Sequence, residues 1–335
     1  MKKRVTNLAE VGSVHDGSFG NALKLIKLAA ECGADIVKFQ THIAEAETLK
    51  EAPMPSFFKG EPRYVYFERT GFSLEQWKEL KSECDKQGIE FLSSPFSIEA
   101  VELLEEIGIK QYKVPSGEVT NLPLMKVIAE TRKPVLLSSG MSTWQELDEA
   151  VKTFQKIHNN ITVLQCTSEY PCSYDNVGLN IMQEAKERYQ LPVGLSDHTI
   201  TNYSAFTAVA LGASVIEKHL TFSRKMYGSD AKHSLEPYEF SEMVKGIHAI
   251  ETILSSKVDK DEIANRMGNI KEVFQKSIVS IVDIPKGTFI TEEMIGFKKP
   301  GTGIPASKIE TVLGKFSKRD ILKDRLISKE DIENA

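Results

Sequence analysis

The sequence is short of cysteine and has no long apolar run. Its four cysteines, among 335 residues, show neither CxxC nor zinc-knuckle spacing; they are Cys32, Cys84, Cys166 and Cys172. This argues against a disulfide scaffold or a structural zinc site and predicts reduced thiols in a cytoplasmic enzyme. No apolar stretch follows the basic first residues, and the most apolar long segment, 205–216, is too short to span a bilayer. We therefore expect neither a signal peptide nor a membrane partner.

The chain also lacks an excess of positive charge and a glycine-rich nucleotide loop. Lys and Arg number 42 against 47 Asp and Glu, which gives a formal net charge of −5, and no basic stripe offsets it. A nucleic-acid partner is therefore not expected. The early segment Gly12-Ser-Val-His-Asp-Gly17 does not follow the GxGxxG pattern, which argues against a dinucleotide site.

What the sequence does contain is a regular alternation of short apolar segments with amphipathic helical segments over about its first 250 residues. The predicted strands number eight: 7–12, 36–40, 90–94, 111–115, 135–138, 161–165, 193–195 and 215–217. Eight strands, each followed by a helix, predict an α/β fold of the (β/α)8, or TIM-barrel, type. An open doubly wound sheet is the alternative.

Two segments interrupt this rhythm. Residues 41–71 form a long connection rich in proline and aromatic residues, which we expect to cover the mouth of the barrel as a partial lid. After 255–275, a charged segment that we interpret as a linker, short strands and Pro-Lys-Gly turns follow. We therefore divide the chain into a barrel domain at 1–254, the linker at 255–275 and a small domain at 276–335.

Two histidines close consecutive predicted strands, at the edge where (β/α)8 enzymes carry their active sites. His198 and His219 are expected to present their imidazoles at this one rim. Imidazole is a common metal ligand, and a site with two protein ligands leaves positions for water and substrate. A hydrogen-bonded pair of core histidines is the alternative.

Lysines, hydroxyls and carboxylates follow the same edge. Buried ammonium groups at Lys38 and Lys113 are costly unless a phosphate or carboxylate pairs with them. For Lys113, a salt bridge to Glu118 or Glu10 is the alternative, although these carboxylates can also move protons or orient a metal-bound water. Hydroxyl groups that can donate to phosphate oxygens stand at Ser94, Ser116, Ser138 and Ser196. This combination predicts a metal-assisted enzyme that acts on an anionic, oxygen-rich substrate.

Ordered short motifs along nearly the whole chain resemble those of the sialic acid synthase family. They include Lys38-Phe-Gln-Thr41, Tyr112-Lys-Val-Pro-Ser-Gly-Glu118, Leu137-Ser-Ser-Gly-Met141, Gly194-Leu-Ser-Asp-His-Thr199 and Ile216-Glu-Lys-His219. The resemblance implies a TIM barrel followed by a small antifreeze-like (SAF, β-clip) domain. It implies condensation of phosphoenolpyruvate with an N-acylated amino sugar of the N-acetylmannosamine type, giving a nine-carbon 2-keto sugar acid and phosphate. It also implies a divalent metal (Mn²⁺, or Mg²⁺ or Co²⁺) and a domain-swapped homodimer.

The resemblance also implies roles for individual residues. The metal would bind His198 and His219, which together with Glu10 and Glu118 form the expected catalytic set. Phosphoenolpyruvate would contact Lys38, Ser94, Lys113, Ser116, Ser138 and Ser196. The sugar would contact Gln40, Tyr170, Asp230 and Lys299.

The chain departs from the family pattern at two positions. Val14 stands where Asn is usual, and Lys299 replaces an arginine in Lys-Pro-Gly, so bidentate hydrogen bonding is lost there. The acceptor stays open between N-acetylmannosamine, its 6-phosphate and a 2,4-diacetamido-6-deoxy hexose, the last for a legionaminate or pseudaminate synthase. Two other classes are a Schiff-base aldolase that uses Lys113 and a non-catalytic sugar-binding scaffold.

Overall fold

The computed structural model describes residues 4–53 and 61–334, and the chain divides into two compact units, Met1–Ser256 and Lys257–Ala335. The first unit contains one sheet of eight parallel strands. They are β1 (Thr6–Gly12), β2 (Ile36–Thr41), β3 (Glu90–Pro95), β4 (Tyr112–Val114), β5 (Val135–Ser138), β6 (Ile161–Cys166), β7 (Val193–Asp197) and β8 (Val215–His219). All eight coincide with predicted strands.

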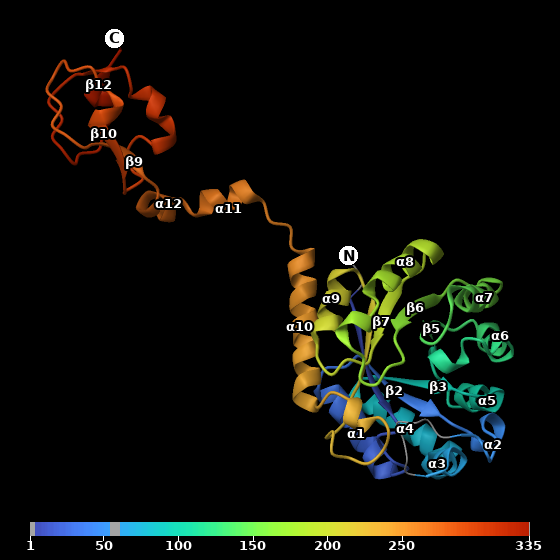
Figure 1. Ribbon diagram of the computed structural model, residues 1–335. Helices are drawn as coiled ribbons and strands as arrows, with labels where there is room; N and C mark the ends of the chain where they lie inside the picture. Colours follow the sequence, from blue (N-terminus) through green and yellow to red (C-terminus); the bar gives the residue numbers. More distant parts are fainter. Residues whose placement is uncertain (1–3, 54–60, 335) are drawn as a thin grey trace. The chain divides into compact units, whose positions relative to one another are not determined.

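The sheet forms a nearly closed barrel, which confirms the expected (β/α)8 fold. Its hydrogen-bonded order is β3-β2-β1-β8-β7-β6-β5-β4, so the first and last strands of the barrel domain, β1 and β8, pair, and β3 lies against β4. Figure 1 shows the helices outside the strands. They are α1 (Phe19–Glu31), α4 (Leu74–Gln87), α5 (Ile98–Glu106), α6 (Leu122–Glu130), α7 (Trp144–Gln155), α8 (Leu179–Tyr189), α9 (Tyr203–Ala210) and α10 (Pro237–Ser255).

Helix ends form where the local sequence supplies capping groups. Ser73 and Gln76 make the expected capping box at the start of α4, in which each side chain accepts from the other's backbone N–H. Gly88 ends the same helix in the left-handed conformation, at φ 69°, which glycine adopts without steric cost. Within residues 4–53 and 61–334, no helix has both the length and the apolar character needed to cross a membrane.

The barrel interior is closed at one level by a small apolar layer. Six buried side chains from six strands form a cluster separate from the main core: Leu8, Ile36, Leu92, Leu136, Leu164 and Val215. The main core lies instead between the strands and the surrounding helices, where residues such as Phe39, Leu25 and Phe154 are fully buried. Stacked layers of inward side chains are how a barrel of this size fills its interior.

The long connection after β2 contains two short helices, α2 (Ala44–Glu47) and α3 (Arg63–Thr70). The aromatic residues Phe57 and Phe58 of the expected lid lie outside the described residues. His42 stacks between Phe67 and Phe96, with ring centroids 3.8 Å and 4.1 Å away. These contacts hold the connection against the loop that follows β3.

The second unit begins with helices α11 (Lys260–Arg266) and α12 (Gly268–Phe274) and continues in short strands. Antiparallel pairs form between β9 (Ser277–Ser280) and β10 (Ile295–Lys298), and between β11 (Phe316–Ser317) and β12 (Ile332–Glu333). Its core is apolar and small: Ile278, Ile284, Ile290, Ile295, Ile304, Val312, Ile321 and Ile327. Buried serines complete the unit by donating to backbone carbonyls, as Ser277 does to Pro300 at 2.7 Å.

Candidate active site

A cavity of about 480 Å³ opens at the carboxyl ends of the strands. Because side chains on one strand alternate between its two faces, residues two positions beyond the apolar layer face the same interior. At that next level the interior becomes polar, with Glu10, Lys38, Ser94, Ser138, Cys166 and Glu217. The barrel interior therefore changes from apolar to charged within two residues along its strands, and the charged level forms the cavity floor.

Two buried lysines share one carboxylate on this floor. Lys38 Nζ lies 2.7 Å from Glu10 Oε2 and 3.3 Å from Glu217 Oε1. Lys113 Nζ lies 3.3 Å from the other oxygen of Glu217 and donates to Ser138 Oγ at 2.8 Å. The salt bridge of Lys113 is thus made to Glu217, and not to Glu118 or Glu10, the two partners considered as the alternative from sequence.

The pKa directions follow from this sharing. Burial lowers the pKa of Lys113, because half a shared carboxylate does not offset the loss of water. The pKa of Lys38 is raised, since Glu10 and Glu217 together outweigh burial. Burial raises the pKa of Glu10 despite its contact with Lys38. The ammonium group of Lys113 has three N–H donors, and two of them point to Glu217 and Ser138 among the described contacts, so one is left for an added anion.

The two predicted metal ligands lie side by side at the rim. The rings of His198 and His219 both line the cavity, with centroids 5.5 Å apart. His198 Nδ1 is 2.8 Å from the carbonyl oxygen of Thr167, which can only accept, so the proton is on Nδ1 and the lone pair on Nε2. Burial lowers the pKa of His198 to about 4, which keeps the ring neutral.

A divalent metal fits this donor set. Nδ1 of His219 is buried without a hydrogen-bond partner among the described residues. In His198, the carbonyl of Thr167 holds Nδ1, and a metal-bound imidazole is usually supported by such a contact on its other nitrogen. In the described part of the chain, no group of three or more His, Cys, Asp or Glu side chains is placed to hold a metal. A metal at this rim would therefore take His198 and His219 as its two protein ligands.

The other predicted site residues divide by position. The cavity lining contains, besides those above, Gln40, Ser116, Tyr170, Ser196 and Asp230. Ser94 is not among the lining residues, and its hydroxyl accepts from Lys38 Nζ at 3.3 Å. Glu118, outside the lining, accepts from Asn121 at 2.8 Å. Lys299 belongs to the second unit, where its ammonium stands 4.9 Å from the ring centre of Phe274, and its contact with a sugar stays a prediction.

The segment expected to form a partial lid supplies one wall of the cavity, although none of its residues was predicted to bind substrate or metal. His42, Arg63, Tyr66 and Phe67, all from the connection after β2, line it. His42 bonds Glu47 at 2.7 Å and Gln40 at 3.1 Å, and Gln40 in turn donates to Glu10 at 2.7 Å. A hydrogen-bonded chain therefore runs from this wall to the charged floor. The aromatic content of 41–71 was the available signal, although it could not identify His42.

Fold and site define a (β/α)8-barrel enzyme whose mouth joins two imidazoles to a floor of lysines, carboxylates and hydroxyls. The chain belongs to the NeuB family, which matches residues 25–259, and an SAF domain matches residues 275–333. The expected resemblance to sialic acid synthases, including the small C-terminal domain, is thereby confirmed.

Individual relatives cover nearly the whole chain. The N,N'-diacetyllegionaminic acid synthase of Campylobacter jejuni is 39% identical over 97% of this chain and 99% of its own length. The human N-acetylneuraminate-9-phosphate synthase is 33% identical over 98% of this chain and 92% of its own. Among solved structures, an N-acetylneuraminic acid synthetase from Leptospira borgpetersenii in complex with citrate aligns at a TM-score of 0.69 and 30% identity, over 79% of this chain and 92% of that one.

Proposed function

We propose that the chain condenses phosphoenolpyruvate with an N-acylated amino sugar, releasing phosphate and a nine-carbon 2-keto sugar acid. The observation that carries this proposal is the cavity floor, where Lys38 and Lys113 meet around the single carboxylate of Glu217. Such a floor suits a substrate with both a phosphate and a carboxylate. The synthases among the relatives support the same reaction class.

Phosphoenolpyruvate would bind over the lysines. Fixed ammonium groups in a site that excludes water stabilise phosphate oxygens more strongly than the same charges would in water. Hydroxyl groups on the cavity wall would donate to the same oxygens without adding charge, from Ser116, Ser138 and Ser196. Ser94 would act indirectly, since it holds the ammonium of Lys38.

The chemistry then requires a proton acceptor beside the reacting carbons. The C3 atom of phosphoenolpyruvate forms a bond to the aldehyde carbon of the open-chain sugar, while the aldehyde oxygen takes up a proton and becomes a hydroxyl group. C2 of phosphoenolpyruvate then becomes an oxocarbenium-like centre. Water adds to C2, and the tetrahedral adduct loses phosphate by breaking the C2–O bond. Glu10 would take the proton from that water, because its raised pKa suits a general base and Gln40 and Lys38 fix its two oxygens.

We propose that His198 and His219 hold the divalent metal, with Mn²⁺ as the first choice. When bound, the metal would supply Lewis-acid polarisation of the sugar aldehyde. The side chains that would orient the sugar against it are Tyr170, stacked on His198 with centroids 4.1 Å apart, and Asp230, which is fixed by Ser13 N and Ser229 Oγ. Holding both substrates in one cavity adds the proximity contribution.

N-acetylmannosamine is the first acceptor to test, and a 2,4-diacetamido-6-deoxy hexose is the second. Support for the diacetamido hexose comes from sequence identity, which is 39% to the Campylobacter jejuni N,N'-diacetyllegionaminic acid synthase and 33% to the human N-acetylneuraminate-9-phosphate synthase. We further propose a cytoplasmic, domain-swapped homodimer in which Lys299 reaches the partner's sugar. The separate core of the second unit supports this, because that unit can pack as an independent body.

The test is phosphate release from phosphoenolpyruvate with each sugar in turn, with and without Mn²⁺. We expect release only when sugar and metal are both present, and loss of activity in excess chelator that Mn²⁺ restores. Undiminished release without a sugar, or in excess chelator, contradicts the proposal. Sedimentation equilibrium tests whether the chain is a dimer, and the kinetics of Lys299→Ala test whether Lys299 reaches the sugar.

A further inference from the structure

Behind the proposed metal ligands, a buried ion pair joins the same two strands. Asp197 and Lys218 are cross-strand neighbours in the β7–β8 ladder, and each directly precedes one of the two histidines. Strand alternation therefore sends His198 and His219 into the cavity and this pair to the opposite face. Lys218 Nζ lies 2.8 Å from Asp197 Oδ2, and both side chains are only 1% exposed. The proposed reaction makes no use of either group.

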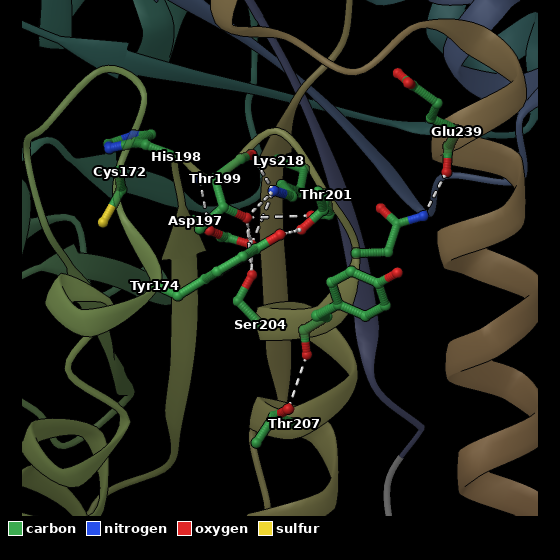
Figure 2. Close-up of polar contacts among 12 residues, drawn as sticks. Cys172, Tyr174, Asp197, His198, Thr199, Thr201, Ser204, Thr207, Lys218 and Glu239 are labelled. Carbon is green, nitrogen blue, oxygen red and sulfur yellow. Dashed lines mark hydrogen bonds and ion pairs between the residues drawn. The ribbon is translucent and has the colours of Figure 1, made fainter.

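The pair also fixes the backbone on both sides of His198. Lys218 donates to the carbonyl and, at 3.0 Å, to the hydroxyl of Thr199. Asp197 Oδ1 accepts from Thr199 N at 2.8 Å, and its Oδ2 accepts from the hydroxyl of Ser204 at the start of α9. Figure 2 shows this cluster, with the His198 ring pointing away from it. The residues before and after His198 are thus tied to the residue before His219.

We propose that Asp197 and Lys218 are positioning residues that set the spacing and orientation of the two imidazoles for a divalent metal. This inference rests on the proposed function in so far as His198 and His219 are the metal ligands. A buried ion pair with further hydrogen bonds has one favourable arrangement, because water is not there to replace a lost contact. Its geometry passes directly to the neighbouring histidines through one peptide unit on each strand.

The test measures metal binding apart from catalysis. Full-length wild type and Lys218→Met are titrated with Mn²⁺ alone, and free Mn²⁺ is followed by electron paramagnetic resonance. We expect the Kd to rise about 10- to 100-fold in the variant, as for loss of groups that orient metal ligands. The control is Asp148→Asn, which removes the charge and one of the two oxygens that accept from Arg188, at 2.8 and 2.6 Å, on the outside of the barrel. It should lower thermal stability and leave the Kd unchanged.

A gentler variant decides the matter if Lys218→Met does not fold. Ser204→Ala removes one hydrogen bond to Asp197 and keeps the ion pair, so we expect a smaller rise in Kd with a stable protein. The inference is overturned if the folded variants bind Mn²⁺ as wild type does, if the control weakens binding equally, or if wild type binds no Mn²⁺. A wild type that binds Mn²⁺ but releases no phosphate with any sugar refutes the proposed function, while the expected Kd pattern would still support the positioning role.

Discussion

Loss of the Glu217 carboxylate should lower the stability of the barrel domain strongly, because among the described contacts it is the only residue that bridges Lys38 and Lys113. After Glu217→Gln, the amide has no charge, and its single oxygen can accept from only one of the two lysines. Lys38 would still have Glu10 at 2.7 Å, whereas Lys113 would have no other carboxylate among the described contacts and would keep the Ser138 hydroxyl at 2.8 Å. Removing one partner of a buried pair typically destabilises a protein by about 3–5 kcal/mol. For a unit of this size each kcal/mol lowers the unfolding temperature by about 2–4 °C, so we expect a fall of roughly 6–20 °C.

Differential scanning calorimetry of the full chain measures this shift. The matched control is Glu242→Gln on α10, where an exposed carboxylate lies 2.9 Å from Lys245. An exposed pair contributes at most about 1 kcal/mol, so the control should move by a few degrees or less. A Glu217→Gln shift no larger than the control's would refute the shared-carboxylate floor. Added phosphoenolpyruvate should raise the unfolding temperature of both variants, since its binding site stays on the lysines.

Three further results are expected. Borohydride with pyruvate should leave the mass of Lys113 unchanged, and a trapped adduct there would favour the Schiff-base aldolase instead. His42→Phe keeps a ring between its aromatic neighbours but loses the hydrogen bond to Gln40. A cost of about 1–3 kcal/mol for the unpaired buried group, if it falls on the transition state, lowers kcat roughly 5- to 150-fold. An unchanged kcat would contradict a role for the hydrogen-bonded chain. Gly140→Ala would place its Cβ 2.5 Å from Ser116 Oγ, so the KM for phosphoenolpyruvate should rise, and an unaltered KM would contradict a role for that hydroxyl.

Much of the barrel was predictable from sequence because its signals are local. Strand alternation and helical periodicity are properties of neighbouring residues, and they placed all eight strands. The same alternation, applied to strand ends, brought His198, His219, Lys38 and Lys113 to one cavity. These residues were found because a closed ring of parallel strands leaves their carboxyl ends only one edge to share.

Pairings across the ring were less accessible. Lys113 was matched with nearby or plausible carboxylates, yet its partner, Glu217, comes from β8, which is not a neighbour of β4 in the sheet. The stagger and closure of the strands decide which residues meet across the barrel interior. The sequence of the strand ends does not give this information. The segment that includes His42 and Arg63 was expected to cover the mouth, but its lining residues were not identified, since the path of a long connection follows no repeating pattern.

That wall has a consequence for how such enzymes diversify. His42, Arg63, Tyr66 and Phe67 come from one excursion of the chain, while the charged floor comes from the strands. Exchanging residues 42–70 for those of a relative would therefore replace one wall of the cavity in a single step. The lysines and glutamates of the cavity floor would stay unchanged. If His42 is kept in such an exchange, its link through Gln40 to Glu10 stays intact while the other lining residues of the wall change.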